Sequence, residues 1–110
     1  MCTQNDAIRI MCEAKALCSK LIPVKEAYLY GSYARGDFHP ESDIDILLTA
    51  ELLPGDVSKY RRQIAAITSE LSLENDITVS VTVKSDEQFR RFSEALPFYK
   101  NVRSEGIRYA

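Results

Sequence analysis

The chain has few of the features that mark secreted or membrane proteins. Its three cysteines, Cys2, Cys12 and Cys18, are odd in number, and their separations match neither a zinc pair nor a disulfide framework, which indicates reduced thiols. No apolar run is long enough to span a bilayer, and charged residues interrupt the N-terminal segment where a signal peptide would need an apolar core. These absences favour a cytoplasmic location.

An excess of charge of one sign is also missing. The 110 residues carry a formal net charge of -2, with acidic and basic residues interspersed. The sequence therefore does not predict a basic surface for duplex nucleic acid, which argues against a polymerase. The length suits one domain spanning residues 1–110 without a second lobe, and no repeat, linker or low-complexity segment divides it.

Helical and extended patterns together predict an α+β fold. Apolar residues at helical spacing predict a first helix over residues 5–21 and a longer one that begins with Asp56 as its cap. Strands are predicted at 26–30, 43–48 and 76–84. A capping pattern at Ser85 predicts a short helix, and the tail is expected to add a last helical turn and an extended end. The expected architecture is a short mixed β-sheet with helices packed on one face.

The run GSYARGDFHPESDIDI, which begins at Gly31, is the part of the sequence that indicates a chemistry. A glycine-serine turn after an apolar strand can direct backbone N–H groups at a phosphate, with Gly31 permitting close approach and Ser32 offering a hydroxyl. Because side chains alternate along a strand, Asp43 and Asp45 are expected on one face, where a cation would offset their repulsion. The pattern therefore predicts a site for phosphate and a divalent cation.

Other interpretations of these letters fit less well. A P-loop would need a second glycine and a lysine at set positions, and this run has neither. Phosphatases of the haloacid dehalogenase type also use Asp-x-Asp, but their first aspartate ends an apolar strand, whereas Asp43 follows the polar run 39–42. The Arg-Gly-Asp tripeptide at 35–37 resembles an adhesion sequence, although nothing else in the chain suggests secretion.

The order of strand, Gly-Ser turn, short helix, polar loop and Asp-x-Asp strand resembles the nucleotidyltransferases of the DNA polymerase beta superfamily. Within that superfamily, GSYARGDFHPESDIDILL is similar to the minimal nucleotidyltransferases, the MNT proteins found as antitoxins beside HEPN-domain toxins. The resemblance implies a two-metal Mg²⁺ site and a nucleoside triphosphate substrate such as ATP. It further implies that a hydroxyl attacks the alpha phosphate and that pyrophosphate leaves.

The resemblance also implies a role for each residue of the motif. Asp43 and Asp45 would be the catalytic metal ligands, and Gly31, Ser32 and Arg35 would bind the nucleotide. Two simpler roles remain open from the residues alone. Ser32 could cap the short helix, and Arg35 could pair with a neighbouring carboxylate.

One position departs from the family pattern. Active members place a third carboxylate on the neighbouring strand, and the matching residue here is Ser80. The nearest acidic alternative, Asp76, is four residues earlier, which is about 13 Å along a strand. Two hypotheses follow. The protein is either an enzyme that transfers a nucleotide, AMP for example, to a hydroxyl of a HEPN-type toxin, or a catalytically weak antitoxin-like module that binds nucleotide and partner.

Overall fold

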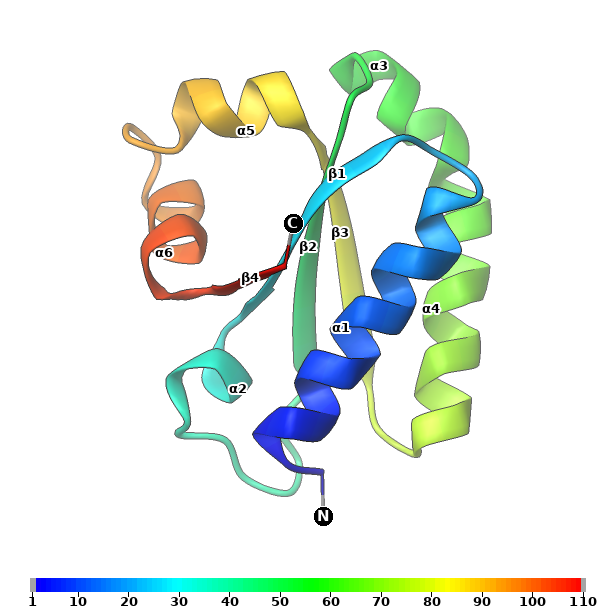
Figure 1. Ribbon diagram of the computed structural model, residues 1–110, viewed down its shortest axis with the longest axis vertical. Coiled ribbons are helices and arrows are strands. Elements are labelled where there is room, and N and C mark those ends of the chain that lie inside the picture. Colours follow the sequence, from blue (N-terminus) through cyan, green and yellow to red (C-terminus); the bar gives the residue numbers. More distant parts are fainter. Residues whose placement is uncertain (1, 110) are drawn as a thin grey trace.

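The computed structural model describes residues 2–109, which form a four-stranded sheet in the order β3-β2-β1-β4 (Figure 1). The strands are β1 (Val24–Tyr30), β2 (Ile44–Ala50), β3 (Val79–Ser85) and β4 (Ile107–Tyr109). β1 is antiparallel to both β2 and β4, whereas β2 and β3 are parallel. The predicted mixed sheet and α+β class are therefore confirmed, and the C-terminal segment adds a fourth strand.

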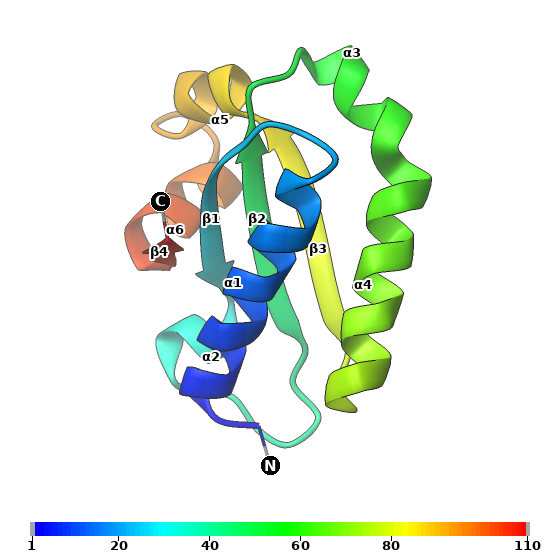
Figure 2. The same ribbon diagram turned by 45° about the vertical axis from the view of Figure 1, so that its right-hand side comes forward.

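Helices lie on both sides of this sheet (Figures 1 and 2). They are α1 (Gln4–Ser19), α2 (Ser32–Arg35), α3 (Pro54–Val57), the 3-10 turn η1 (Ser58–Tyr60), α4 (Arg61–Asn75), α5 (Asp86–Phe92) and α6 (Pro97–Glu105). Both views show α1 and α4 on one side and α5 and α6 on the other. Over residues 2–109, none of these helices combines the length and the apolar character needed to cross a membrane.

The buried residues explain this two-sided arrangement. Ile44, Ile46 and Leu48 of β2 are fully buried in the core beneath α1 and α4. A second core on the opposite face consists of Tyr28, Leu47, Phe89, Tyr99 and Val102. The sequence predicted helices on one face only. This is right for α1 and α4 and wrong for α5 and α6, which pack on the opposite face. The correction arises because β1 and β2 carry large apolar side chains on both faces, and both faces need cover.

Two predicted boundaries shift for local reasons. β3 begins at Val79 and not at Asp76, because Asp76 ends α4 in a left-handed conformation with φ of 50°, and its N–H donates to the carbonyl of Ser72. Asp56 lies inside α3 instead of capping it. That helix begins at Pro54, whose fixed φ suits the first helical position.

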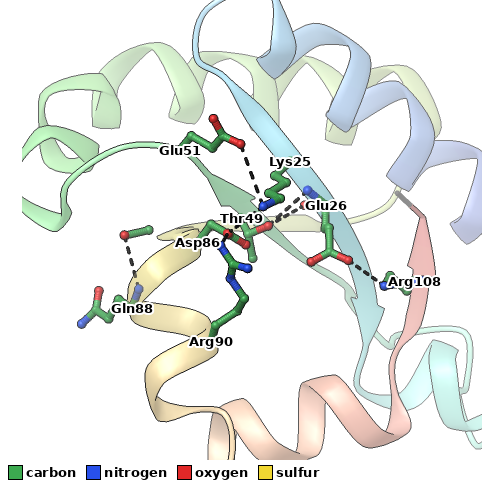
Figure 3. A network of polar contacts seen from close by, with 9 residues as sticks. Lys25, Glu26, Thr49, Glu51, Asp86, Gln88, Arg90 and Arg108 are labelled. Carbon is green, nitrogen blue, oxygen red and sulfur yellow. Dashed lines mark hydrogen bonds and ion pairs between the residues drawn. The ribbon is translucent and has the colours of Figure 1, made fainter.

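Polar contacts connect the start of α5 to the end of the sheet that lies far from the Gly-Ser turn (Figure 3). Ser85 Oγ accepts a hydrogen bond from the N–H of Gln88 at 3.4 Å, which confirms the predicted cap. The neighbouring Asp86 carboxylate lies 2.7 Å from Arg90 Nη2 and 3.4 Å from Lys25 Nζ. Only 3% of the Asp86 side chain is exposed, so these two cations offset the cost of burying its charge.

Candidate active site

Gly31 lies in the turn between β1 and α2, where both backbone and surroundings require glycine. Its φ is 75°, in a region that residues with side chains rarely adopt. A Cβ atom at this position would lie 2.5 Å from Oδ2 of Asp45. The missing side chain therefore lets the Asp45 carboxylate lie directly against the turn. This contact brings the Gly-Ser and Asp-x-Asp halves of the motif together.

Asp43 and Asp45 line one shallow pocket with a volume of about 450 Å³. Asp43 is exposed immediately before β2, and Asp45 is half-buried on the strand itself. The other lining residues are Ser32, Arg35, Asp37, His39, Glu41 and Ser42. With Gly31 lying against Asp45, the structure brings all five sequence-predicted site residues to one place.

The electrostatics of the acidic pair favour a bound cation. Burial raises the pKa of Asp45, the negative charge of Asp43 raises it further, and the positive charge of Arg35 lowers it. The charged form of Asp45 is therefore disfavoured until positive charge is added beside it. One or two carboxylates together with phosphate oxygens form the usual ligand set of Mg²⁺ in nucleotide sites. The residues present therefore fit a divalent cation that arrives with a triphosphate.

Ser32 and Arg35 both line this pocket, although their local roles differ. Gly31 holds the N-cap position of α2 and Ser32 is the first helical residue, so the interpretation of Ser32 as the cap is not supported. Arg35 Nε lies 3.2 Å from Oδ2 of Asp37, as expected for a pair with a neighbouring carboxylate. Because that arginine is about half exposed, its guanidinium remains accessible from the pocket.

Hydrogen bonds within the polar loop fix the entry to β2. The N–H of His39 donates to Ser42 Oγ at 2.9 Å, and the N–H of Ser42 donates back to the His39 carbonyl at 2.9 Å. The N–H of Glu41 donates to His39 Nδ1 at 3.2 Å. The imidazole therefore stabilises the loop that positions Asp43.

Ser80 lies beside Asp45, at the position where the resemblance leads us to expect a carboxylate. The parallel register of β2 and β3 pairs Asp45 with Ser80, as the sequence predicted. Asp76 does not substitute, because it ends α4 and lies outside β3. In the part of the chain that the structure describes, no three acidic, cysteine or histidine side chains gather as a metal cluster. No third carboxylate from residues 2–109 therefore joins Asp43 and Asp45 in a metal cluster.

Tyr30 is a neighbour of the acidic pair that sequence reasoning missed. It is the last residue of β1, and the antiparallel register pairs it with Asp45, so both side chains lie on the same face. Burial raises the pKa of Tyr30, a hydrogen bond with Thr82 partly opposes this, and the negative charge of Asp45 raises it further. The hydroxyl is therefore protonated at neutral pH and able to donate a hydrogen bond. Only the register between β1 and β2 reveals this neighbour.

Comparison with known proteins identifies the family. The sequence profile of a family described as a nucleotidyltransferase domain matches residues 11–109. Two candidate protein adenylyltransferases of Methanocaldococcus jannaschii are similar. MJ0141 is 38% identical over 77 residues, covering 68% of this chain and 76% of its own length. MJ0604 is 37% identical over 84 residues, covering 76% of this chain and 75% of its own.

Solved structures share the fold. A candidate nucleotidyltransferase from Sulfolobus solfataricus matches 96% of this chain and 81% of its own, with a TM-score of 0.61 and 21% identity. A toxin-antitoxin structure with AMP-PNP matches 96% of this chain and 70% of its own, with a TM-score of 0.55 and 20% identity. The profile match and the two archaeal relatives show that the chain belongs to the nucleotidyltransferase domain family, and hence that it is a transferase.

Proposed function

We propose that the protein is a Mg²⁺-dependent nucleotidyltransferase that transfers AMP from ATP to a hydroxyl group of a partner protein. The main support is the Asp45 carboxylate, which lies against the Gly31 turn in the pocket that it shares with Asp43. The names of the archaeal relatives favour AMP as the group transferred and a protein as the acceptor. The toxin-antitoxin neighbour with AMP-PNP favours ATP as the donor.

Different pocket residues would bind the cation and the phosphates. Asp43 and Asp45 would hold the divalent cation, which when bound neutralises the triphosphate and stabilises the charge that develops during transfer. Ser32 and Arg35 would bind phosphate oxygens, and Gly31 would let them approach the backbone. The acceptor oxygen forms a bond to the alpha phosphorus as the bond to pyrophosphate breaks, and the hydroxyl proton passes to solvent. Most of the rate enhancement then comes from positioning and electrostatics.

The acceptor that we favour is a HEPN-type toxin in the cytoplasm. The motif resembles those of MNT antitoxins, and a toxin-antitoxin structure shares the fold over 96% of this chain. In this proposal the protein acts as an antitoxin by attaching the nucleotide to the toxin.

A label-transfer assay tests the proposal. The purified chain is mixed with Mg²⁺, ATP labelled at the alpha phosphate and the product of the adjacent gene, and label on protein is measured. Transfer should disappear in Asp43→Ala and persist in Glu70→Ala, which removes an exposed carboxylate of α4 that lies outside the pocket. Transfer that survives Asp43→Ala would refute the assignment of the acidic pair.

Ser80 favours a second candidate function, a module that binds nucleotide and partner without turnover. Its position beside Asp45 leaves the acidic pair without the third carboxylate of active family members. A module of this kind would bind AMP-PNP with Mg²⁺ yet transfer no detectable label, and Ser80→Asp would bring transfer to at least about 100-fold above the detection limit. Ser80→Asn is the uncharged control. Label transfer by the unmodified chain would show that the protein is an active enzyme and would exclude the binding module.

A further inference from the structure

The backbone of β3 is partly open to solvent along its outer side. Among residues 2–109, β3 has β2 on one side and no strand on the other. The N–H of Ile44 donates to the carbonyl of Thr78 at 2.9 Å, and residues of a parallel strand alternate between bonding the neighbour and facing away from it. Val79, Val81 and Val83 therefore direct their N–H and C=O groups away from β2.

Contacts of α4 support this alternation and limit how much of the edge is covered. The N–H of Val79 donates to Ser72 Oγ of α4 at 3.0 Å, on the side away from β2. The outward groups of Val81 and Val83 have no hydrogen-bond partner in the described chain. α4 thus covers the start of the edge and leaves its continuation available. Unpaired edge groups of this kind are templates for an added strand.

A groove of about 740 Å³ runs along this open edge, between β3 and the first half of α4. Val81, Val83 and Ile64 give it an apolar surface. Ser80 and Asp43 also line it, and Asp43 belongs to the catalytic pocket as well. A chain lying in the groove would therefore pass next to the acidic pair.

The charges of the groove complement an acidic chain. Arg61 and Lys84 line it, and neither forms an ion pair with any residue between 2 and 109. Asp43 is the one carboxylate among the described lining residues, and it lies where the groove meets the catalytic pocket. The body of the groove is therefore positively charged and favours carboxylate side chains.

We propose that the groove binds an extended, acidic segment of the acceptor protein, which pairs with β3 as an added strand and brings the acceptor hydroxyl to the catalytic pocket. This inference rests on the proposed function for the reaction, whereas the binding can be measured alone. Backbone bonds to Val81 and Val83 give affinity, and Arg61 and Lys84 select acidic side chains. The outward-facing residues 79–83 span about 13 Å, so a short segment reaches the acidic pair.

Charge reversal tests the choice of occupant. The probe is a fluorescent eight-residue peptide in which glutamate alternates with valine and the last residue is tyrosine, and its binding to the full chain is followed by fluorescence anisotropy. Arg61→Glu combined with Lys84→Glu should weaken binding at least about tenfold. Arg62→Glu, the next residue on α4 and outside the groove lining, is the matched control and should change binding by less than about twofold. Equal binding of a peptide with lysine for glutamate would overturn the proposal.

N-methylation of the peptide tests the mode of binding. An added strand uses alternate peptide N–H groups, so methylation at every second position should abolish binding and methylation between them should not. If methylation at either set of positions abolished peptide binding equally, strand addition would be refuted. A stable dimer of the chain in sedimentation experiments, together with no binding of the peptide, would favour a second copy as the occupant of the edge and would also overturn the proposal.

Calorimetric titration with AMP-PNP and Mg²⁺ separates this inference from the proposed function. Nucleotide binding without peptide binding would refute the groove assignment and leave the reaction standing. Peptide binding that is sensitive to Arg61 and Lys84, without nucleotide binding, would refute the reaction and leave the groove as a docking site.

Discussion

At the scale of single residues, Gly31 is the position where the absence of a side chain makes the site possible. Gly31→Ala would place a Cβ atom 2.5 Å from Asp45 Oδ2, which forces the carboxylate to move. Gly36 has a similar φ of 89°, but a Cβ atom there would meet no other atom within 4 Å, so Gly36→Ala is the matched control. Gly36→Ala should cost about 1–2 kcal/mol of stability, because Gly36 has the left-handed conformation. Gly31→Ala should cost about 1–3 kcal/mol, because its ψ of -155° places it in a region open essentially to glycine alone. Only Gly31→Ala should lose label transfer, by about 100-fold.

Urea unfolding measures the first effect and label transfer the second. Equal loss of transfer in the two alanine variants would mean that strain in the loop, and not the contact with Asp45, accounts for the glycine at position 31.

The raised pKa of Asp45 predicts a pH-dependent gain in stability on neutralising it. Burial and the charge of Asp43 disfavour the charged form in the folded state, so Asp45→Asn should stabilise the chain at pH 7. The gain should be less than about 1 kcal/mol, because the carboxylate is partly solvated. It should disappear as the pH falls through the raised pKa toward the ordinary value of 3.8. Urea unfolding across this range measures it, and a variant less stable than the parent at pH 7 would contradict it.

At the scale of elements, α5 depends on the ion pairs of its first turn. Arg90→Ala removes the closer of the two cations from the buried Asp86 carboxylate and should cost about 1–3 kcal/mol of unfolding free energy. Arg91→Ala, on the same helix, removes an exposed pair with Glu87 and should cost less than about 1 kcal/mol. Denaturant unfolding compares the two variants. Similar losses would show that Asp86 is stabilised by other means.

Helices and strands that are marked by a pattern among neighbouring residues could be predicted from the sequence. The alternation of Ile44 and Ile46 with Asp43 and Asp45 defined β2 and placed the acidic pair on one face, and the distance from the next helix identified Ser80. Features that depend on distant contacts could not be predicted. On the second face of the sheet, side chains of β1 and β2 pack against α5 and α6, whose residues are distant in the sequence.

The neighbours of the site show the same limit. Nothing in the sequence indicates that Tyr30 lies beside Asp45, because that pairing depends on how β1 and β2 align. The start of β3 was placed three residues too early, at Asp76, because a left-handed aspartate at that position ends α4 without a glycine or proline to mark the turn.

At the scale of the whole molecule, the two ends of the sheet differ in character. One end carries the acidic pair and the Gly-Ser turn, and the other carries the network that anchors α5. The groove along β3 extends from Asp43 toward Gln88 at the start of α5, and so links the two ends. A partner bound along it would contact both the pocket of the acidic pair and α5.

The account depends on Asp43 and Asp45 holding a divalent cation together with a triphosphate beside Gly31. Calorimetric titration of the chain with AMP-PNP, with and without Mg²⁺, measures this directly. We expect binding that requires Mg²⁺ and weakens at least about tenfold in Asp45→Ala, with Glu70→Ala, which lies outside the pocket, unchanged. Nucleotide binding that is equally strong without Mg²⁺, or equally strong in Asp45→Ala, would contradict the account.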